Sequence, residues 1–285
     1  MSGSTQPRSA RFTLGVCSWS LQVKNIPELK GFLGTLGVNV VQIACGDPHH
    51  ANWDEGDQLP AAALASGIEM TGAMLGFPGE DYTSPETIKR TGGFGDLATR
   101  AERLDRLAWG LERTRALGLL DLTLHAGFLP EPGDPARPAF LGTLVKAGKM
   151  AAEAGITLAF ETGQETAQLL RQTLEDVASP SIGVNFDPAN MLLYDMGDPV
   201  EAVEILGDWI RSVHLKDALR PTVPGQWGQE VPLGQGAVGI PRFLAALESI
   251  GYRGPLVVER EVGDQAGRLR DVAAGLAYLK TLVPA

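Results

Sequence analysis

A short apolar segment followed by a helix-forming segment recurs eight times along the 285 residues of this chain. The predicted strands are Phe12–Trp19, Asn39–Ala44, Glu69–Leu75, Leu120–His125, Ile156–Glu161, Ile182–Asp187, Ile210–Lys216 and Leu256–Glu259. The predicted helices are Pro27–Leu36, Leu59–Ala65, Asp96–Leu117, Pro138–Ala154, Thr166–Val177, Pro199–Leu206, Pro241–Ile250 and Ala266–Leu282, with a long loop over Gly76–Gly95. No recurring hairpin signal joins the strands, so we expect them to be parallel and connected by helical crossovers.

Eight is the number of parallel strands that closes a barrel, and the predicted fold is therefore a single α/β domain, a (β/α)8 TIM barrel. The main alternative is an open, doubly wound sheet. That fold typically carries GxGxxG after its first strand, where this chain has CSWSLQ. We expect residues 12–285 to form the barrel and the polar residues 1–11 to form a flexible tail before it.

Composition excludes several classes of protein. An apolar fraction of 44% argues against disorder, and a formal charge of −10 argues against a nucleic-acid partner. No apolar run is long enough to span a membrane, and Met1–Arg11 is too polar for a secretory signal, so the default location is the cytoplasm. Cys17 and Cys45 show no metal-binding spacing, and we expect both to be buried, reduced thiols.

Four consecutive predicted strands each deliver one side chain that can bind a metal. The four residues are Glu161, Asp187, His214 and Glu259. In a barrel the carboxyl ends of the strands meet at one face, where three carboxylates would repel one another unless a cation lay between them. The mixture of oxygen and nitrogen ligands suits one divalent ion, Mn²⁺, Mg²⁺, Co²⁺ or Zn²⁺. Taken singly, Asp187 could instead cap a helix, and Glu259 could be a solvated rim charge.

The motifs FETGQE, NFDPAN, VHLKDA, LGQGAVG and GPLVVERE occur in this order and resemble the sugar-phosphate isomerase/epimerase superfamily. This group shares the xylose-isomerase-like barrel and includes tagatose/psicose 3-epimerases, hydroxypyruvate isomerase, inosose dehydratase and endonuclease IV. The resemblance covers the last four strands well and the first half in outline. It implies the same four metal ligands, with Glu161 and Glu259 also acting as the acid/base pair of the epimerases. Dimers and tetramers are common in the family.

The resemblance implies a divalent-metal-dependent isomerase or epimerase of a keto-sugar or sugar phosphate. A metal that bridges the carbonyl and hydroxyl oxygens of an α-hydroxy ketone would acidify the C–H bond and stabilise an enediolate. One glutamate would remove the proton, and the other would return a proton from the opposite face.

Six further residues are candidates for substrate binding: Arg220, Lys216, Asn190, His125, Trp19 and Gln164. Arg220 lies where the epimerases place a substrate-binding arginine, Asn190 stands where some carry histidine, and Trp19 resembles their aromatic wall. Each has a structural alternative. Lys216 could pair with Asp217 or Glu230, and the others could serve in packing, capping or turns.

Other loop residues leave alternatives open. Glu261 would replace Glu259 as ligand if the strand register slipped by two residues. His49 and His50 fit exposed loop positions better than the mouth of the site, and Trp227 could help to form a lid. A phosphate on the substrate would need backbone amides and a cation, which Lys216, Arg220 and the turn 234–236 could supply.

Three other functions compete with epimerisation. A dehydratase of a keto-polyol such as an inosose could use His125 or Lys216 as the acid for the leaving group. An endonuclease-IV-like site is disfavoured, because it needs several more histidines than the four in this chain. A non-catalytic sugar-binding barrel is the remaining alternative, although the ligand set is intact.

Overall fold

The structure is a computed structural model that describes residues 12–46, 53 and 56–283. The predicted tail over residues 1–11 and the loop histidines His49 and His50 lie outside the described residues. Every structural statement below concerns the described parts of the chain.

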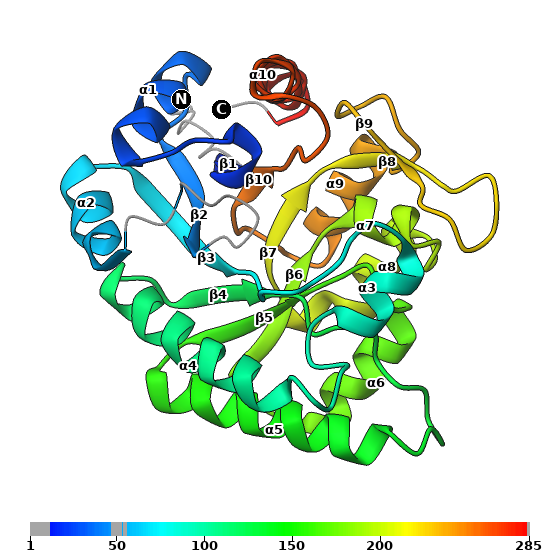
Figure 1. The fold of residues 1–285 in the computed structure, drawn as a ribbon. Coiled ribbons are helices and arrows are strands. Elements are labelled where there is room, and N and C mark those ends of the chain that lie inside the picture. The colour runs from blue at the N-terminus through cyan, green and yellow to red at the C-terminus, as the bar shows by residue number, and fades with distance from the viewer. Residues whose placement is uncertain (1–11, 47–52, 54–55, 284–285) are drawn as a thin grey trace, which may run out of the picture.

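Eight parallel strands close into a barrel (Figure 1), which confirms the predicted (β/α)8 fold. The strands are β1 (Leu14–Cys17), β2 (Val40–Gly46), β3 (Glu69–Leu75), β4 (Asp121–Leu124), β5 (Thr157–Glu161), β6 (Ile182–Phe186), β7 (Ile210–Leu215) and β10 (Leu256–Val258). Their order around the barrel is β1-β10-β7-β6-β5-β4-β3-β2. The ring closes where β1 pairs with β10, with Val16 opposite Val258.

The predicted helices surround the strands as an outer layer (Figure 1). They are α1 (Ile26–Leu36), α2 (Leu59–Ser66), α4 (Arg100–Ala116), α5 (Arg137–Ala154), α6 (Ala167–Val177), α8 (Pro199–Leu206), α9 (Ile240–Ser249) and α10 (Gln265–Leu282). Local sequence sets their ends. The Asn25 side chain accepts from Glu28 N at the start of α1, and Gly37 ends that helix in the left-handed region at φ 66°. The apolar core fills the space between strands and helices.

Two short α-helices and two short strands were not predicted: α3 (Pro85–Thr91), α7 (Pro188–Leu193), β8 (Asp217–Leu219) and β9 (Gln229–Val231). Helix α3 replaces part of the loop predicted over residues 76–95 and begins with a capping box between Ser84 and Thr87. Strands β8 and β9 form an antiparallel pair outside the barrel. Each of these elements is too short to produce a periodic apolar pattern in the sequence.

The first strand ends earlier than predicted. It was expected to run to Trp19, but β1 stops at Cys17 and Trp19 begins a 3₁₀ turn, Trp19–Leu21. The chain bends at Ser18, whose backbone adopts helical angles and whose hydroxyl accepts a hydrogen bond from Ala44 N at 2.9 Å. The bend carries the Trp19 ring over the mouth of the barrel.

The predicted burial of the two cysteines is confirmed. Cys17 and Cys45 are both buried, and neither forms a disulfide. No helix within the described residues is long and apolar enough to cross a membrane.

Candidate metal centre

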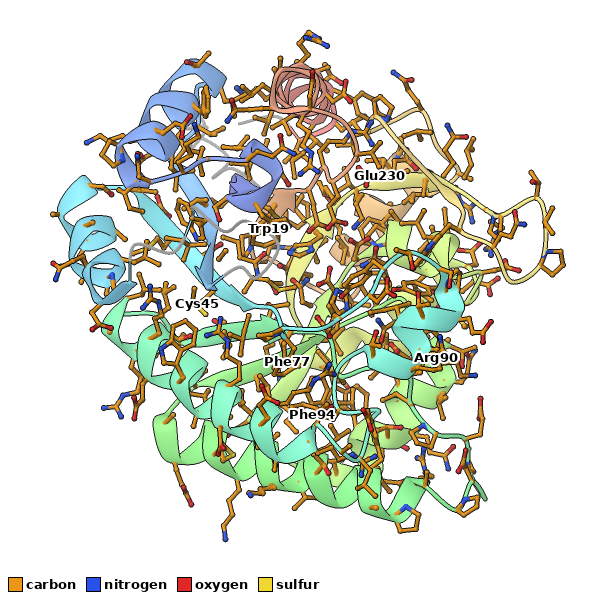
Figure 2. The ribbon with its side chains drawn as sticks, in the orientation of Figure 1. Trp19, Cys45, Phe77, Arg90, Phe94 and Glu230 are labelled. Carbon is orange, nitrogen blue, oxygen red and sulfur yellow. The ribbon has the colours of Figure 1, made fainter. Side chains whose placement is uncertain are left out.

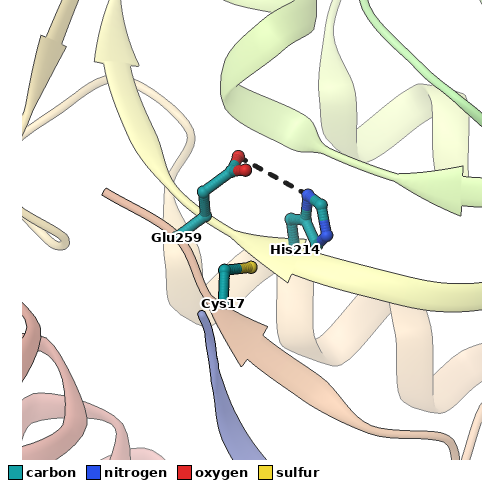
Figure 3. Close-up of side chains that lie close together, drawn as sticks. All are labelled: Cys17, His214 and Glu259. Carbon is teal, nitrogen blue, oxygen red and sulfur yellow. Dashed lines mark ion pairs between the residues drawn. The ribbon is translucent and has the colours of Figure 1, made fainter. Parts of the chain in front are cut away.

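The four predicted metal ligands come together at the carboxyl end of the barrel. Glu161 ends β5, Asp187 follows β6, His214 lies in β7 and Glu259 follows β10. One ligand atom from each lies within 4.8 Å of every other, and all four side chains are buried. His214 Nδ1 is 2.9 Å from Glu161 Oε1, 3.5 Å from Glu259 Oε2 and 3.9 Å from Asp187 Oδ2. Figure 3 shows the Glu259 carboxylate facing the His214 ring.

Asp187 both caps a helix and faces the cluster, because its two oxygens have different partners. Oδ1 accepts from Ala189 N at 2.8 Å and from Asn190 N at 2.9 Å, which caps α7. Oδ2 points the other way, 3.0 Å from Lys216 Nζ. The two roles that the sequence left as alternatives are therefore compatible.

Lys216 places a buried positive charge directly beside the carboxylates of the cluster. Its ammonium is fully buried, 2.6 Å from Glu259 Oε2 and 3.0 Å from Asp187 Oδ2. Burial raises the pKa of Asp187 to about 8, in spite of the Lys216 charge. Burial also opposes ionisation of Glu259, but Lys216 and His214 hold the pKa of that carboxyl well below its usual range. A divalent ion would favour the ionised form of both carboxylates.

The donor set fits a divalent cation. Glu161 Oε2 and Asp187 Oδ2 are buried and make no hydrogen bond, and their charged neighbours are His125 Nε2 at 3.3 Å and Lys216 Nζ at 3.0 Å. Three carboxylates and one imidazole are a mixed oxygen and nitrogen set of the kind that Mn²⁺, Mg²⁺, Co²⁺ and Zn²⁺ accept. The described residues therefore contain a site that could hold such an ion.

A second group of possible ligands combines Cys17 with His214 and Glu259 (Figure 3). A cysteine binds metal as its thiolate. Burial raises the pKa of the Cys17 thiol to about 12, which keeps it neutral. The four-residue set offers one more ligand, and its three carboxylates suit the hard divalent ions named above.

Gln42 orients the histidine and was not predicted. This buried side chain in β2 contacts His214 Nε2 through its Oε1 atom, and its amide donates to Thr123 Oγ1 at 3.0 Å. Because Oε1 is an acceptor, it holds the proton on Nε2, so that the neutral imidazole of a metal-bound His214 would present its Nδ1 lone pair to the ion. The available signal was a polar residue in the middle of the apolar strand VVQIACG.

A cavity of about 610 Å³ opens beside the cluster, within the size range of small-molecule sites. Its lining combines glutamates, aromatic rings and a few other polar groups: Glu80, Glu161, Glu230, Glu259, Glu261, Trp19, Tyr82, Tyr194, Trp227, His125, Asn190 and Arg268. Figure 2 shows Trp19 near the centre of the ring of strands and Glu230 on the side of the β8–β9 pair. Trp227, predicted as a lid residue, lines the cavity, and its indole N–H is buried without a hydrogen-bond partner.

Three of the predicted substrate-binding residues line this cavity and contact one of the two glutamates. Trp19 Nε1 donates to Glu259 Oε1 at 2.6 Å. His125 Nε2 is 3.3 Å from Glu161 Oε2, and Asn190 Nδ2 donates to Glu161 Oε1 at 3.3 Å. These contacts come from the turn after β1, the residue that follows β4 and helix α7, which only the fold brings together.

The other three predicted substrate-binding residues do not line the cavity. Arg220 is exposed, pairs with Asp195 Oδ1 at 2.7 Å and is not one of the residues that line the cavity. Gln164 is buried next to Tyr194, which lines the cavity, and its amide donates to the Tyr194 hydroxyl at 3.3 Å. Lys216 is buried among carboxylates.

The register of the last strand does not slip. Glu259 N donates to the Leu215 carbonyl at 3.1 Å, in line with the β7–β10 ladder. Glu261, the alternative ligand, has a half-exposed side chain that pairs with Lys216 Nζ at 2.8 Å. It takes no part in the four-residue cluster.

Comparison with known proteins agrees with this architecture. Residues 32–282 match the family model described as Xylose isomerase-like TIM barrel. The chain is 35% identical to a xylose isomerase domain protein from Planctomyces limnophilus, with a TM-score of 0.85 over 95% of this chain and 97% of that one. It is 25% identical over 242 residues to L-ribulose-5-phosphate 3-epimerase UlaE of Escherichia coli, covering 79% of this chain and 78% of that protein.

A D-tagatose 3-epimerase-like protein shares the fold at 19% identity, with a TM-score of 0.69 over 95% of this chain and 97% of that one. The match to the family model extends from α1 to the end of α10 and so includes all four residues of the cluster. By sequence and by fold, this chain belongs to the xylose isomerase-like TIM barrel family.

Proposed function

We propose that this chain is a divalent-metal-dependent epimerase or isomerase of a keto-sugar, with Glu161 and Glu259 as its acid/base pair. The observation that carries the proposal is the convergence of these two buried glutamates at the wall of one cavity, with Glu161 Oε1 2.9 Å and Glu259 Oε2 3.5 Å from His214 Nδ1. The likeness to a protein named as a ribulose-phosphate 3-epimerase supports the same class of reaction.

Glu161, Asp187, His214 and Glu259 would hold the metal ion. When bound, the ion would supply the positive charge that polarises the carbonyl and hydroxyl oxygens of the sugar. Side chains of the cavity would bind the sugar and transfer its protons.

The two glutamates exchange protons with the carbon next to the carbonyl group. One removes the proton from one face of the sugar, and the other returns a proton to the opposite face. Trp19 and Lys216 fix the carboxylate of Glu259, while His125 and Asn190 fix that of Glu161. Each carboxylate is thereby held in one orientation before the substrate binds.

Replacing Glu161 or Glu259 by Gln tests the role of the pair. Each change keeps the size of the side chain and removes its proton-accepting oxygen. We expect exchange of the C3 proton of a ketose with solvent to fall by about 10²–10⁴-fold in each variant. The measurement is the loss of deuterium from C3-labelled ketoses, followed by nuclear magnetic resonance in Mn²⁺-supplemented buffer.

The matched control is Glu204→Gln, which changes an exposed glutamate on α8 and should exchange the proton at the wild-type rate. Metal content and circular dichroism of all variants separate a lost base from a lost metal site or a lost fold. Wild-type exchange in both Glu161→Gln and Glu259→Gln would refute the assignment.

A dehydratase of a keto-polyol is the second candidate. His125 favours it, because the ring lines the cavity, contacts Glu161 and carries a buried Nδ1 atom without a hydrogen-bond partner. A protonated imidazole in that position could donate a proton to a leaving hydroxyl group. Mass spectrometry separates the two reactions, since epimerisation conserves the mass of the sugar and dehydration removes one water.

A further inference from the structure

The proposed function leaves open whether the sugar carries a phosphate group. We infer that the cavity takes an uncharged ketose or keto-polyol and discriminates against its phosphate ester. The inference rests on the proposed function, because it names the substrate class of the same cavity. The evidence is that the backbone amides and cationic side chains that a phosphate would need already have other partners within the protein.

The backbone amides of the turn after β9 are occupied. Phosphate sites in barrels of this kind often use the loops after the last two barrel strands. Here Gly234 N and Gly236 N donate to Asp217 Oδ2 at 3.0 and 2.9 Å, and Val238 N donates to Asp217 Oδ1 at 3.1 Å. A buried carboxylate thus fills the place that an anion would take.

The loop after β10 offers no better anion site. It leads into α10, whose first turn is capped by Asp264, with Gly267 N donating to Asp264 Oδ1 at 2.8 Å. A second acidic side chain therefore stands at the helix start that a phosphate would approach.

The cations that the sequence offered for a phosphate also have other partners. Arg220 pairs with Asp195, and Lys216 is enclosed by three carboxylates. Arg268 lines the cavity, but its guanidinium donates to the carbonyl oxygens of Trp19, Glu261 and Gly263. Among the described residues that line the cavity, it is the only lysine or arginine.

Charge in the cavity opposes a phosphate as well. Five glutamates line it against that one arginine, and the whole chain carries a formal charge of −10. Glu230 pairs with Arg260 at 2.7 Å, and a divalent ion would offset part of the charge of the metal-binding carboxylates. Among the described residues that line the cavity, positive charge does not exceed negative charge, so a phosphate dianion would find no excess of cations there.

The rest of the lining suits a neutral polyol. Trp19, Tyr82, Tyr194 and Trp227 offer aromatic surface for the C–H faces of a sugar. The orphan N–H of Trp227 can donate to a hydroxyl oxygen, and the half-exposed carboxylate of Glu261 can accept from a hydroxyl group. An uncharged sugar satisfies these groups without burying an unpaired charge.

The test uses matched pairs of ligands on the Mn²⁺-loaded protein. Isothermal titration calorimetry compares L-ribulose with L-ribulose 5-phosphate and D-tagatose with D-tagatose 6-phosphate, and turnover of each is assayed separately. We expect each free ketose to bind at least about tenfold more tightly than its phosphate ester. Because repulsion is screened by salt, the ratio should shrink between low and high ionic strength.

Glu261→Gln removes one cavity carboxylate and should lower the preference for the free sugar about threefold or more, since a charge that repels phosphate is lost. The matched control is Glu153→Gln, at an exposed site near the end of α5, which should leave the preference unchanged.

Equal or tighter binding of the phosphate esters would overturn the inference and leave the proposed function standing. Binding of neither member of any pair would also overturn it. Tighter binding of the free ketoses with no turnover would support the inference about the ligand and contradict the proposed reaction, so the two failures are distinguishable.

Discussion

Gln42 shows how one polar residue in an apolar strand can prepare a metal site. It is buried between His214 and Thr123, and both of its polar atoms are used. Partners of this kind fix the tautomer and the ring orientation of a metal-binding histidine. The function of Gln42 is therefore to aim His214, while His214 itself would contact the ion.

Replacing Gln42 by Leu should weaken metal binding about 10–100-fold, because the imidazole loses the acceptor that selects its tautomer. Leucine has a similar size and leaves the β2 backbone unchanged. The measurement is a competition for Mn²⁺ between the protein and a chromophoric chelator.

Thr123→Val provides a graded comparison, because it removes only the bond that orients Gln42. We expect a smaller loss of metal affinity than in Gln42→Leu. Unchanged affinity in Gln42→Leu, in a protein that folds as the wild type does, would show that the contact does not position the histidine.

The β8–β9 pair illustrates how one side chain can organise a whole element. Asp217 opens β8 and is almost fully buried, and it accepts hydrogen bonds from the backbone of Ala218, Gly234, Gly236 and Val238. Its carboxylate thus fixes the turn that follows β9. At Gly236 an added Cβ atom would lie 2.1 Å from Asp217 Oδ1, so the close approach requires glycine there.

Asp217→Asn should destabilise the protein by at least about 1.5 kcal/mol. The reason is that each Asp217 oxygen accepts hydrogen bonds from two backbone N–H groups, and asparagine has an NH₂ donor in place of one of these oxygens. The free energy of unfolding in urea measures the loss.

The matched change in an exposed ion pair is Asp195→Asn, which breaks the pair with Arg220 and should cost less than about 1 kcal/mol. Asparagine also tolerates the left-handed backbone at this position, where φ is 58°. Equal losses in the two variants would mean that Asp217 does not hold the turn.

The candidate metal site links much of the barrel. Its residues come from β5, β7 and the segments after β6 and β10, which are neighbours around the ring although they are far apart in the chain. The unfolded chain cannot present these ligands together. Metal binding should therefore stabilise the whole fold rather than one loop.

Addition of Mn²⁺ at 100 times its dissociation constant should stabilise the folded chain by about 2.7 kcal/mol and raise Tm by about 5 °C or more. A chelator should reverse the shift. The measurement is thermal unfolding followed by circular dichroism, with and without the metal.

Asp187→Asn tests whether the shift arises at the proposed site. It retains an oxygen for the α7 cap and loses the carboxylate that faces His214, so it should respond to Mn²⁺ much less than the wild type. A full shift in this variant, or none in the wild type, would contradict the site.

The fold and the central cluster were largely predictable. Each barrel strand is a short apolar run, and each of the four runs that ends at the site changes abruptly to a polar side chain. Such local patterns survive in a barrel because parallel strands are buried on both faces. The ends of elements were less predictable, as at Trp19, where the chain leaves the strand at a bend in which Ser18 has helical backbone angles.

The sequence by itself determined the eightfold alternation and the four residues at the strand ends, because both are properties of neighbouring residues. Only the tertiary structure decided which polar groups have other partners. Arg220, Lys216 and the turn after β9 are all suitable for an anion in the sequence, yet Asp195, Asp187 and Asp217 occupy them from other parts of the chain. Hydrogen bonds and ion pairs between distant segments leave no trace in local periodicity, and here they determine the charge that the cavity presents to a substrate.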